Sequence, residues 1–242
     1  MLFLKKPILL VICVFNLTLI TAQKPEAETK FQLEKVVQFT TETYGINQDL
    51  VCGEVYENLY PNAIGHPFLF ENEFITGNFI FKHKQYKNFP LKYDIAEQRV
   101  IINYNTNNSD IKYYLPNEFL NEFEIYNKKF QKLSIRNKPE RFYQVIEASD
   151  SLKFYFTYDK EKTFSDHMGT TVSYKFSSSK RKGYLMINGD IYNFHGKASI
   201  VKRFPKQIQK QLNKEIKNSH IQVQIAKDNE LLKLLEICNN LL

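Results

Sequence analysis

The chain has 242 residues, a formal net charge of +7 and an aromatic content of 14% that contains no tryptophan. Phenylalanine and tyrosine favour strands over helical bundles, and eight glycines are too few for propeller or β-helix repeats. Lysine and arginine are spread among acidic residues along the whole chain. This distribution argues against a nucleic-acid-binding protein.

Residues 1–22 have the three parts of a cleavable secretory signal. A pair of lysines is followed by an apolar run from Pro7 to Ile20, and the small residue Ala22 precedes Gln23. The run is shorter than the roughly 20 apolar residues of a transmembrane helix; a buried N-terminal strand or helix is the alternative. We therefore expect cleavage between Ala22 and Gln23, export to the periplasm or beyond the cell, and a mature chain without a transmembrane segment.

Residues 23–242 are long enough for a sizeable core, and we expect a single β-rich domain. Export bears on Cys52 and Cys238, because disulfides persist in oxidising compartments. A bridge between them would join the first strand to the last helix and close a long loop. The alternative is two buried free thiols.

Residues 27–44 are predicted to form a helix. They contain neither glycine nor proline, and Leu33, Val37 and Tyr44 fall on one helical face. Gly45 follows, as glycine often does where a helix ends.

Between residues 51 and 195 the period changes to that of strands, in short runs separated by polar turns. The predicted strands cover residues 78–81, 91–93, 99–104, 111–115, 123–126, 141–148, 152–158, 184–187 and 190–194. The clearest is 152–158, where Leu152, Phe154, Phe156 and Tyr158 share one face. We expect an antiparallel meander, with residues 160–170 forming an exposed loop.

The strongest local signal is Asn188-Gly189, because a two-residue type I′ turn needs positive φ at both positions. This turn fixes the register of the hairpin. We expect Ile187 opposite Asp190, Leu185 opposite Tyr192, and Met186 opposite Ile191.

Two helices are predicted near the end, at about 205–217 and 228–241. The first has an apolar stripe and a lysine-bearing face, and Pro205 suits its first turn. Packing on the core is the simpler interpretation of this basic helix, and contact with an anionic membrane surface is the alternative. Asp228 is the expected N-cap of the second helix.

The resulting fold class is mainly β (α+β). We expect a curved antiparallel meander, barrel-like or sandwich-like, with one N-terminal helix and two C-terminal helices that cover an open edge or end. Such cover protects a sheet from pairing with other chains.

The common catalytic and nucleotide-binding motifs are absent from the sequence. The five histidines lack the spacing of metal ligands. We therefore predict no catalytic residue, no metal and no cofactor, and we lean against an enzyme. An unrecognised hydrolase remains an alternative, because folding can assemble catalytic groups from distant positions.

Three residues are candidates for a binding site: His66, Phe68 and Asp94. The first two lie in a turn punctuated by glycine and proline, which forms either a ligand rim or a turn whose Phe68 and Phe70 pack into the core. Asp94 ends a strand before residues 95–98, where aspartate usually bonds its own backbone in a turn.

Several stretches carry a resemblance: Asn58-Leu59-Tyr60, Gly65-His66-Pro67-Phe68, Gly77 and Leu91–Ile95, then Leu185–Tyr192 and Arg203–Lys206. Together they resemble an uncharacterised family of exported proteins from Bacteroidetes. The resemblance covers nearly the whole mature chain and implies export and a single unit, but no site.

The function that these observations favour is that of a non-catalytic binding or interaction module of the cell envelope. Its partner would be an envelope protein or a small ligand. A β-barrel that holds a small apolar ligand is the alternative, and it requires a closed meander with a hollow interior.

Overall fold

The computed structural model describes residues 35, 50, 53–106, 109–136, 138–165 and 173–242. The chain divides into two units, residues 1–45 and 46–242. The predicted signal lies outside the described residues, and so does the predicted helix 27–44 apart from Lys35, which is helical.

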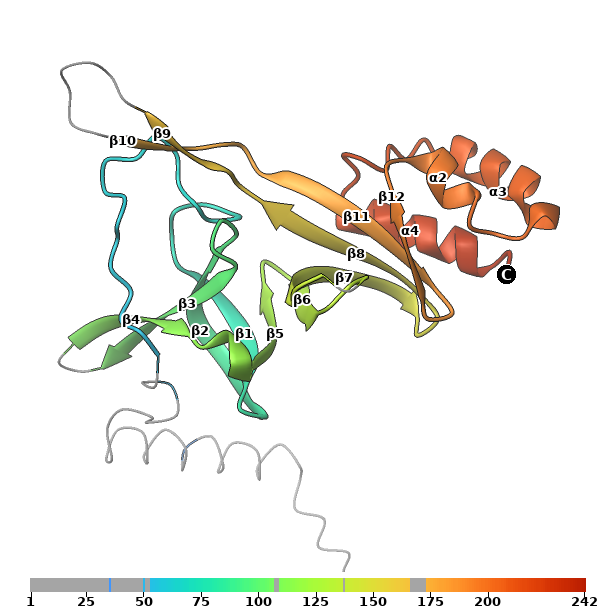
Figure 1. The fold of residues 1–242 in the computed structure, drawn as a ribbon. Helices are drawn as coiled ribbons and strands as arrows, with labels where there is room; N and C mark the ends of the chain where they lie inside the picture. The colour runs from blue at the N-terminus through green and yellow to red at the C-terminus, as the bar shows by residue number, and fades with distance from the viewer. Residues whose placement is uncertain (1–34, 36–49, 51–52, 107–108, 137, 166–172) are drawn as a thin grey trace, which may run out of the picture. The chain divides into compact units, whose positions relative to one another are not determined.

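Ten strands of the second unit form one antiparallel sheet, in the order β12-β11-β8-β7-β6-β5-β1-β2-β3-β4 (Figure 1). Their bounds are β1 Ile75–Phe81, β2 Lys84–Asp94, β3 Arg99–Thr106, β4 Ser109–Leu115, β5 Leu120–Ile125, β6 Lys128–Leu133, β7 Arg141–Ser149, β8 Leu152–Asp159, β11 Lys180–Ile187 and β12 Asp190–Phe194. A separate two-stranded sheet pairs β9 (Lys162–Ser165) with β10 (Ser173–Phe176). The helices are η1 Asn117–Phe119, α2 Lys197–Val201, α3 Lys206–Asn218 and α4 Asp228–Asn239.

The predicted antiparallel meander is confirmed in most of the sheet, where strand neighbours are also neighbours in the sequence. The exceptions are the pairs β11–β8 and β5–β1. The hairpin register is the predicted one: Ile187 pairs with Asp190, Leu185 with Tyr192, and Met186 with Ile191. Asn188 and Gly189 have φ values of +51° and +91°. The turn chemistry therefore determined this register, as expected for a type I′ turn.

Two features of the sheet differ from the prediction. The described strands run from β12 to β4 as an open sheet, and they form no closed barrel. The expected loop 160–170 is wrong for its described part, because β9 lies there and pairs with β10. Four residues give too short an alternation for a strand to be seen in the sequence.

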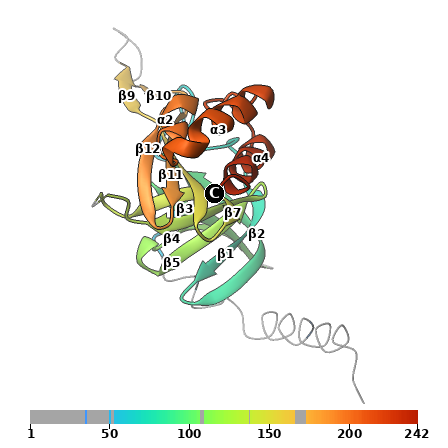
Figure 2. The same cartoon turned by 90° about the vertical axis from the view of Figure 1, so that its right-hand side faces the viewer.

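One face of the sheet carries two apolar cores. The first packs β8, β11 and β12 against α2, α3 and α4, and it includes the predicted apolar face of β8. The second is enclosed by β1–β6 and is rich in phenylalanine and tyrosine. Figures 1 and 2 show the helices on one side of β7, β8 and β11. Helix α4 packs on β7 and β8 and so covers a face of the sheet, where we expected an edge or an end.

The C-terminal helices begin close to their predicted positions. Pro205 is the N-cap of α3, and Leu212 and Ile216 of this helix are buried in the first core. The N-cap of α4 is Lys227 rather than Asp228. The Lys227 amide donates to Glu230 Oε2 at 2.7 Å, and Asp228 accepts instead from Lys128 and Gln144 of the sheet. The Asp228 carboxylate that we expected to cap the helix therefore bonds to side chains of the sheet.

Candidate functional site

Residues 54–69, which we call the strap, cross the end of the sheet near β2, β3 and β4. The strap is held by three single β-bridges, from Val55 to Tyr113 on β4, from Ile64 to Lys175 on β10, and from Phe68 to Asp94 on β2. Two backbone hydrogen bonds of 2.8–3.1 Å flank each bridge. The strap is therefore tied at its beginning, middle and end to strands that are distant in the sequence.

Two glycines allow the strap to approach its neighbours closely. A Cβ atom on Gly53, just before the strap, would lie 1.9 Å from the Tyr114 carbonyl oxygen, which no real side chain tolerates. Gly65 has a φ of +79°, and a Cβ there would lie 3.3 Å from the Phe176 carbonyl oxygen. Glycine is the residue that adopts such a conformation without strain.

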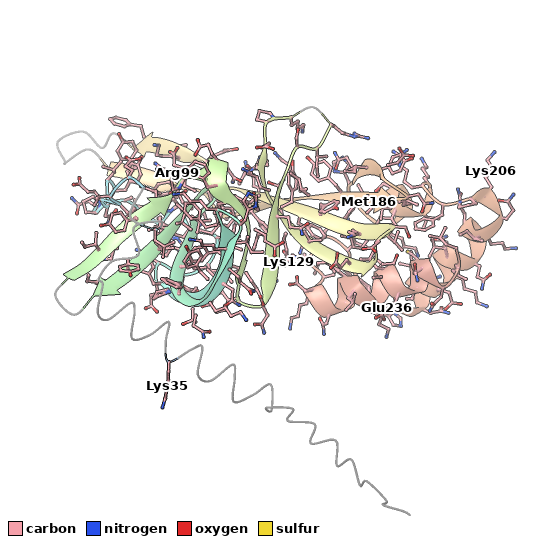
Figure 3. All side chains as sticks on the ribbon, turned by 90° about the horizontal axis from the view of Figure 1, so that it is seen from below. Lys35, Arg99, Lys129, Met186, Lys206 and Glu236 are labelled. Atoms are coloured by element: carbon pink, nitrogen blue, oxygen red, sulfur yellow. The ribbon has the colours of Figure 1, made fainter. Side chains whose placement is uncertain are left out.

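Between the strap and the sheet lies a hollow of about 500 Å³, which we call the groove. Its lining consists of residues 54–60 and Pro67 from the strap, Asp94 at the end of β2, Glu97 in the turn, Arg99 at the start of β3, and Tyr114 from β4. Figure 3 shows Arg99 at the end of the sheet that lies away from the helices marked by Lys206 and Glu236. The groove brings together tyrosine rings, carboxylates and one guanidinium group.

Asp94 is the most deeply buried charged residue of the groove, and only 3% of the residue is exposed. Its Oδ1 atom accepts hydrogen bonds of 2.9 Å from the amides of Ala96 and Glu97, which confirms the predicted turn. Within the described residues, Oδ2 accepts no hydrogen bond. Burial raises the pKa of Asp94 to about 6, against the lowering effect of the two backbone hydrogen bonds.

The turn that carries Asp94 is fixed by Gln98. This residue has a φ of +55°, and its side chain accepts from the Tyr93 hydroxyl at 2.8 Å. It also donates to the carbonyl oxygens of Ile95 and Tyr158, at 2.8 and 3.1 Å. The carboxylate is thus held by a rigid turn, as a preorganised binding group should be.

Two tyrosines form one wall of the groove. The rings of Tyr56 and Tyr114 meet edge to face, with centroids 5.4 Å apart. The Arg99 guanidinium lies 3.5 Å from the Tyr114 ring centroid and pairs with Glu54 at 2.7 Å. Burial raises the pKa of Tyr114 to about 12, and the negative charge of Asp94 adds to this rise. Burial and then the charge of Asp94 raise the pKa of Tyr56 as well. Both hydroxyls therefore stay protonated at neutral pH and remain available as donors.

The far rim of the groove is formed by Tyr60. Its ring packs edge to face on Tyr174 of β10, with centroids 5.0 Å apart. Lys162 of β9 donates to the Tyr60 hydroxyl at 2.6 Å and lies 3.6 Å from Glu97. The hairpin β9–β10, which the sequence did not predict, thus positions this rim.

The structure brings the three predicted binding residues together, but not into one hollow. Phe68, near the end of the strap, is buried, as the turn interpretation predicted. The His66 ring stacks on the Phe68 ring, with centroids 5.8 Å apart. His66 lines a second, more open hollow of about 590 Å³. Its Nδ1 atom is buried without a hydrogen-bond partner, and burial followed by the charge of Lys160 lowers its pKa.

One cation in each of two other hollows is used for structure. In the second hollow, Lys160 Nζ donates to the carbonyl oxygens of His66 and Phe68 at 2.9 and 2.7 Å. A third hollow of about 470 Å³ contains Arg181, whose guanidinium lies 4.7 Å from the Phe156 ring centroid. Arg181 also donates to three carbonyl oxygens between Val223 and Ala226, at 2.6–3.2 Å. Only the groove keeps an almost fully buried carboxylate without a hydrogen bond to one oxygen, among the described hollows.

Of the two cysteines that could form a disulfide, the described residues contain one. Cys238 on α4 is a free thiol and fully buried in the first core. Cys52 lies outside the described residues, so the bridge stays a prediction.

The sequence did not identify most of the groove. Tyr56, Tyr60, Arg99 and Tyr114 come from three separate segments, and each has an ordinary place in a strand or loop when read locally. The only local signal was the dense run of tyrosine and glutamate between residues 54 and 60.

Among the described residues, no three side chains of the His, Cys, Asp or Glu type gather as a metal site would require. None of the described helices has the length and apolarity needed to cross a bilayer. No protein-family model matches the chain, and neither does any curated protein or solved structure.

Proposed function

We propose that this chain is an exported, non-catalytic binding module of the cell envelope, and that the groove is its binding site. The observation that carries the proposal is the position of Asp94. A carboxylate that is 3% exposed lines a hollow of about 500 Å³ and has tyrosine rings beside it. Binding sites typically combine a concave, partly aromatic lining with a few fixed polar groups.

The surroundings of the groove support binding rather than chemistry. His66 and Asp94 line different hollows, so this pair does not form a general acid–base arrangement in one cavity. The rim offers apolar contact area, because Val55 and Leu59 are 53% and 66% exposed. Exposed apolar residues around a concave site often mark a contact surface.

Export and the finer features of the fold are part of the same proposal. They comprise the signal over residues 1–22, the helix over 27–44, and a barrel-like or sandwich-like curvature of the sheet. N-terminal sequencing of the protein recovered from the cell envelope tests export directly. We expect the mature chain to begin at Gln23, and a chain that retains residues 1–22 in the cytoplasm would contradict it.

Binding in the groove is tested by photo-crosslinking in cells that produce the full chain. Leu59 at the rim is replaced by a photoreactive benzoylphenylalanine, and Leu232 on α4, also exposed, is replaced in a matched control. We expect an adduct from position 59 that is lost when Tyr114→Ala is added, and none from position 232. Equal adducts from both positions, or an adduct that Tyr114→Ala leaves unchanged, would overturn the proposed site.

A further inference from the structure

Negatively charged residues outnumber positively charged ones in the lining of the groove. They are carried by Glu54, Glu57, Asp94, Glu97 and Arg99. Two of the carboxylates already have a cation from the chain: Glu54 pairs with Arg99 at 2.7 Å, and Glu97 lies 3.6 Å from Lys162. Asp94 and Glu57 form no ion pair with any described residue. The groove is therefore acidic in a chain whose formal net charge is +7.

Asp94 is the less ordinary of the two unpaired carboxylates. Taking a carboxylate out of water is costly unless a counter-charge and hydrogen bonds compensate for its lost hydration. The amides of Ala96 and Glu97 satisfy only Oδ1. The charges of Arg99 and Lys160 act on Asp94 from a distance, but neither forms an ion pair with it. Arg99 pairs with Glu54, and Lys160 donates to backbone carbonyl oxygens. A cation that enters the groove would supply a direct partner.

The tyrosine rings of the groove already hold cations of the chain itself. The Arg99 guanidinium lies 3.5 Å from the Tyr114 ring centroid, and Lys162 Nζ lies 4.8 Å from that of Tyr60. Cations are attracted to the negative face of an aromatic ring, and more strongly where water is partly excluded. The rings beside the unpaired carboxylates thus form surroundings that suit a further cation.

The rim indicates that this cation belongs to a peptide. Within the bridge to β4, the hydrogen bonds are made by the Glu54 carbonyl and the Tyr56 amide. In an antiparallel bridge of this kind the backbone groups of the central residue, Val55, point away from the partner strand. No described residue bonds to them, but they point away from Asp94, because β3 and β2 lie on the other side of β4. The exposed apolar rim, and not pairing at this edge, therefore indicates a peptide. The exposed side chains of Val55 and Leu59 would contact its apolar residues.

We propose that the groove binds an extended peptide segment in which lysine or arginine alternates with apolar residues, with one cationic group near Asp94 and Glu57. This inference rests on the proposed binding function and specifies its ligand. Charge complementarity selects the basic side chain, and the exposed apolar rim at Val55 and Leu59 selects a polypeptide with apolar residues over a small amine.

The test uses fluorescence anisotropy of the mature full chain with a labelled peptide in which leucine alternates with lysine. Matched peptides carry glutamine or glutamate in place of lysine. We expect the lysine peptide to bind and both others to bind at least about tenfold more weakly. Free spermidine serves as a competitor, and we expect it to displace the peptide only at much higher concentration than an unlabelled copy of the peptide does.

Substitutions in the chain test whether the lysine peptide binds in the groove. We expect Asp94→Asn to weaken binding of the lysine peptide about tenfold, and Glu57→Gln to weaken it less because Glu57 is exposed to water. Glu236→Gln removes a charge from the helical end shown in Figure 3 and should have no effect. Thermal unfolding confirms that each variant is folded, and Asp94→Asn keeps the acceptor for Ala96 and Glu97.

The other outcomes test the peptide inference separately from the proposed binding function. If the glutamine peptide binds as well as the lysine peptide, or if no peptide binds, the inference of a cationic peptide is wrong. If spermidine binds as tightly as the peptide, the ligand of the groove is a free amine and the peptide inference is wrong. In all these cases the crosslink from Leu59 still stands or falls by itself, so failure of the inference is distinguishable from failure of the binding function.

Discussion

Phe68 and Asp94 face each other in an antiparallel bridge between the strap and β2. Both residues are 3% exposed. Phe68 closes the space beneath the strap, where Lys92 Nζ lies 4.7 Å from its ring centroid. Asp94 lines the groove. The bridge therefore places a buried carboxylate beside a surface that a ligand can reach.

The first prediction concerns the stability of the Asp94→Asn variant. The pKa of Asp94 is raised to about 6 in the folded chain, above its unfolded value, so folding favours the protonated form. The contribution of this group to stability is most favourable at low pH and is lost as the pH rises through about 6. We expect Asp94→Asn to stabilise the fold by about 1–3 kcal/mol near pH 8 and by about half as much near pH 5. Urea unfolding at the two pH values measures the free energy of unfolding of both proteins. A variant that is less stable than the unchanged chain near pH 8 would refute the raised pKa of Asp94.

The second prediction concerns the pH dependence of peptide binding. Protonation of Asp94 removes the charge that the cationic peptide contacts. We expect affinity for the leucine–lysine peptide to fall about tenfold between pH 8 and pH 5, with most of the change around pH 6. Anisotropy titrations over this range follow the change. The Asp94→Asn variant is the control and should show a flat profile; an equally steep profile in that variant would assign the titration to another group.

The third prediction concerns the first anchor of the strap. An alanine at position 53 would bring its Cβ against the Tyr114 carbonyl oxygen, so the backbone there must move. We expect Gly53→Ala to destabilise the fold by about 1–3 kcal/mol and to weaken peptide binding. Gly189→Ala is the matched control, because its cost comes from a φ of +91° in open space far from the groove. It should lower stability and leave the affinity unchanged, whereas equal affinities for both variants would show that the anchor does not shape the groove.

The fourth prediction concerns Cys238. The thiol is fully buried, and burial raises its pKa to about 12, so thiolate is scarce at neutral pH. We expect no alkylation of Cys238 in the folded chain and complete alkylation in urea without reductant. Peptide mapping by mass spectrometry reads out the modified residue. Alkylation in urea that requires a reductant would instead establish the bridge to Cys52.

The parts of the fold that the sequence predicted well are those with local causes. The hairpin at Asn188 and Gly189 follows from the φ values that its turn requires, and β8 follows from a strict alternation of apolar residues. Strand β6 was missed because its sequence is dominated by lysine and only Phe130 is fully buried. Its pairing between β5 and β7, rather than its own pattern, makes it a strand.

The groove depends on contacts that local patterns do not contain. Asp94 was singled out as a turn residue, and its side chain does bond the turn. Its burial depends on the strap, which reaches it only because bridges to β4, β10 and β2 hold residues 54–69 in place. The stacking of Arg99 on Tyr114 likewise depends on the pairing of β3 with β4. Such sites follow from sheet topology, which a single sequence does not specify.

Hydrogen–deuterium exchange of the full mature chain, with and without the leucine–lysine peptide, tests the central claim most directly. The claim is that ligands bind in the groove between the strap and the β2–β3 turn. We predict slower exchange on peptide addition in residues 54–60 and 95–99, and unchanged exchange in α3 and α4. Protection confined to the helices, with no change in the strap, would contradict it.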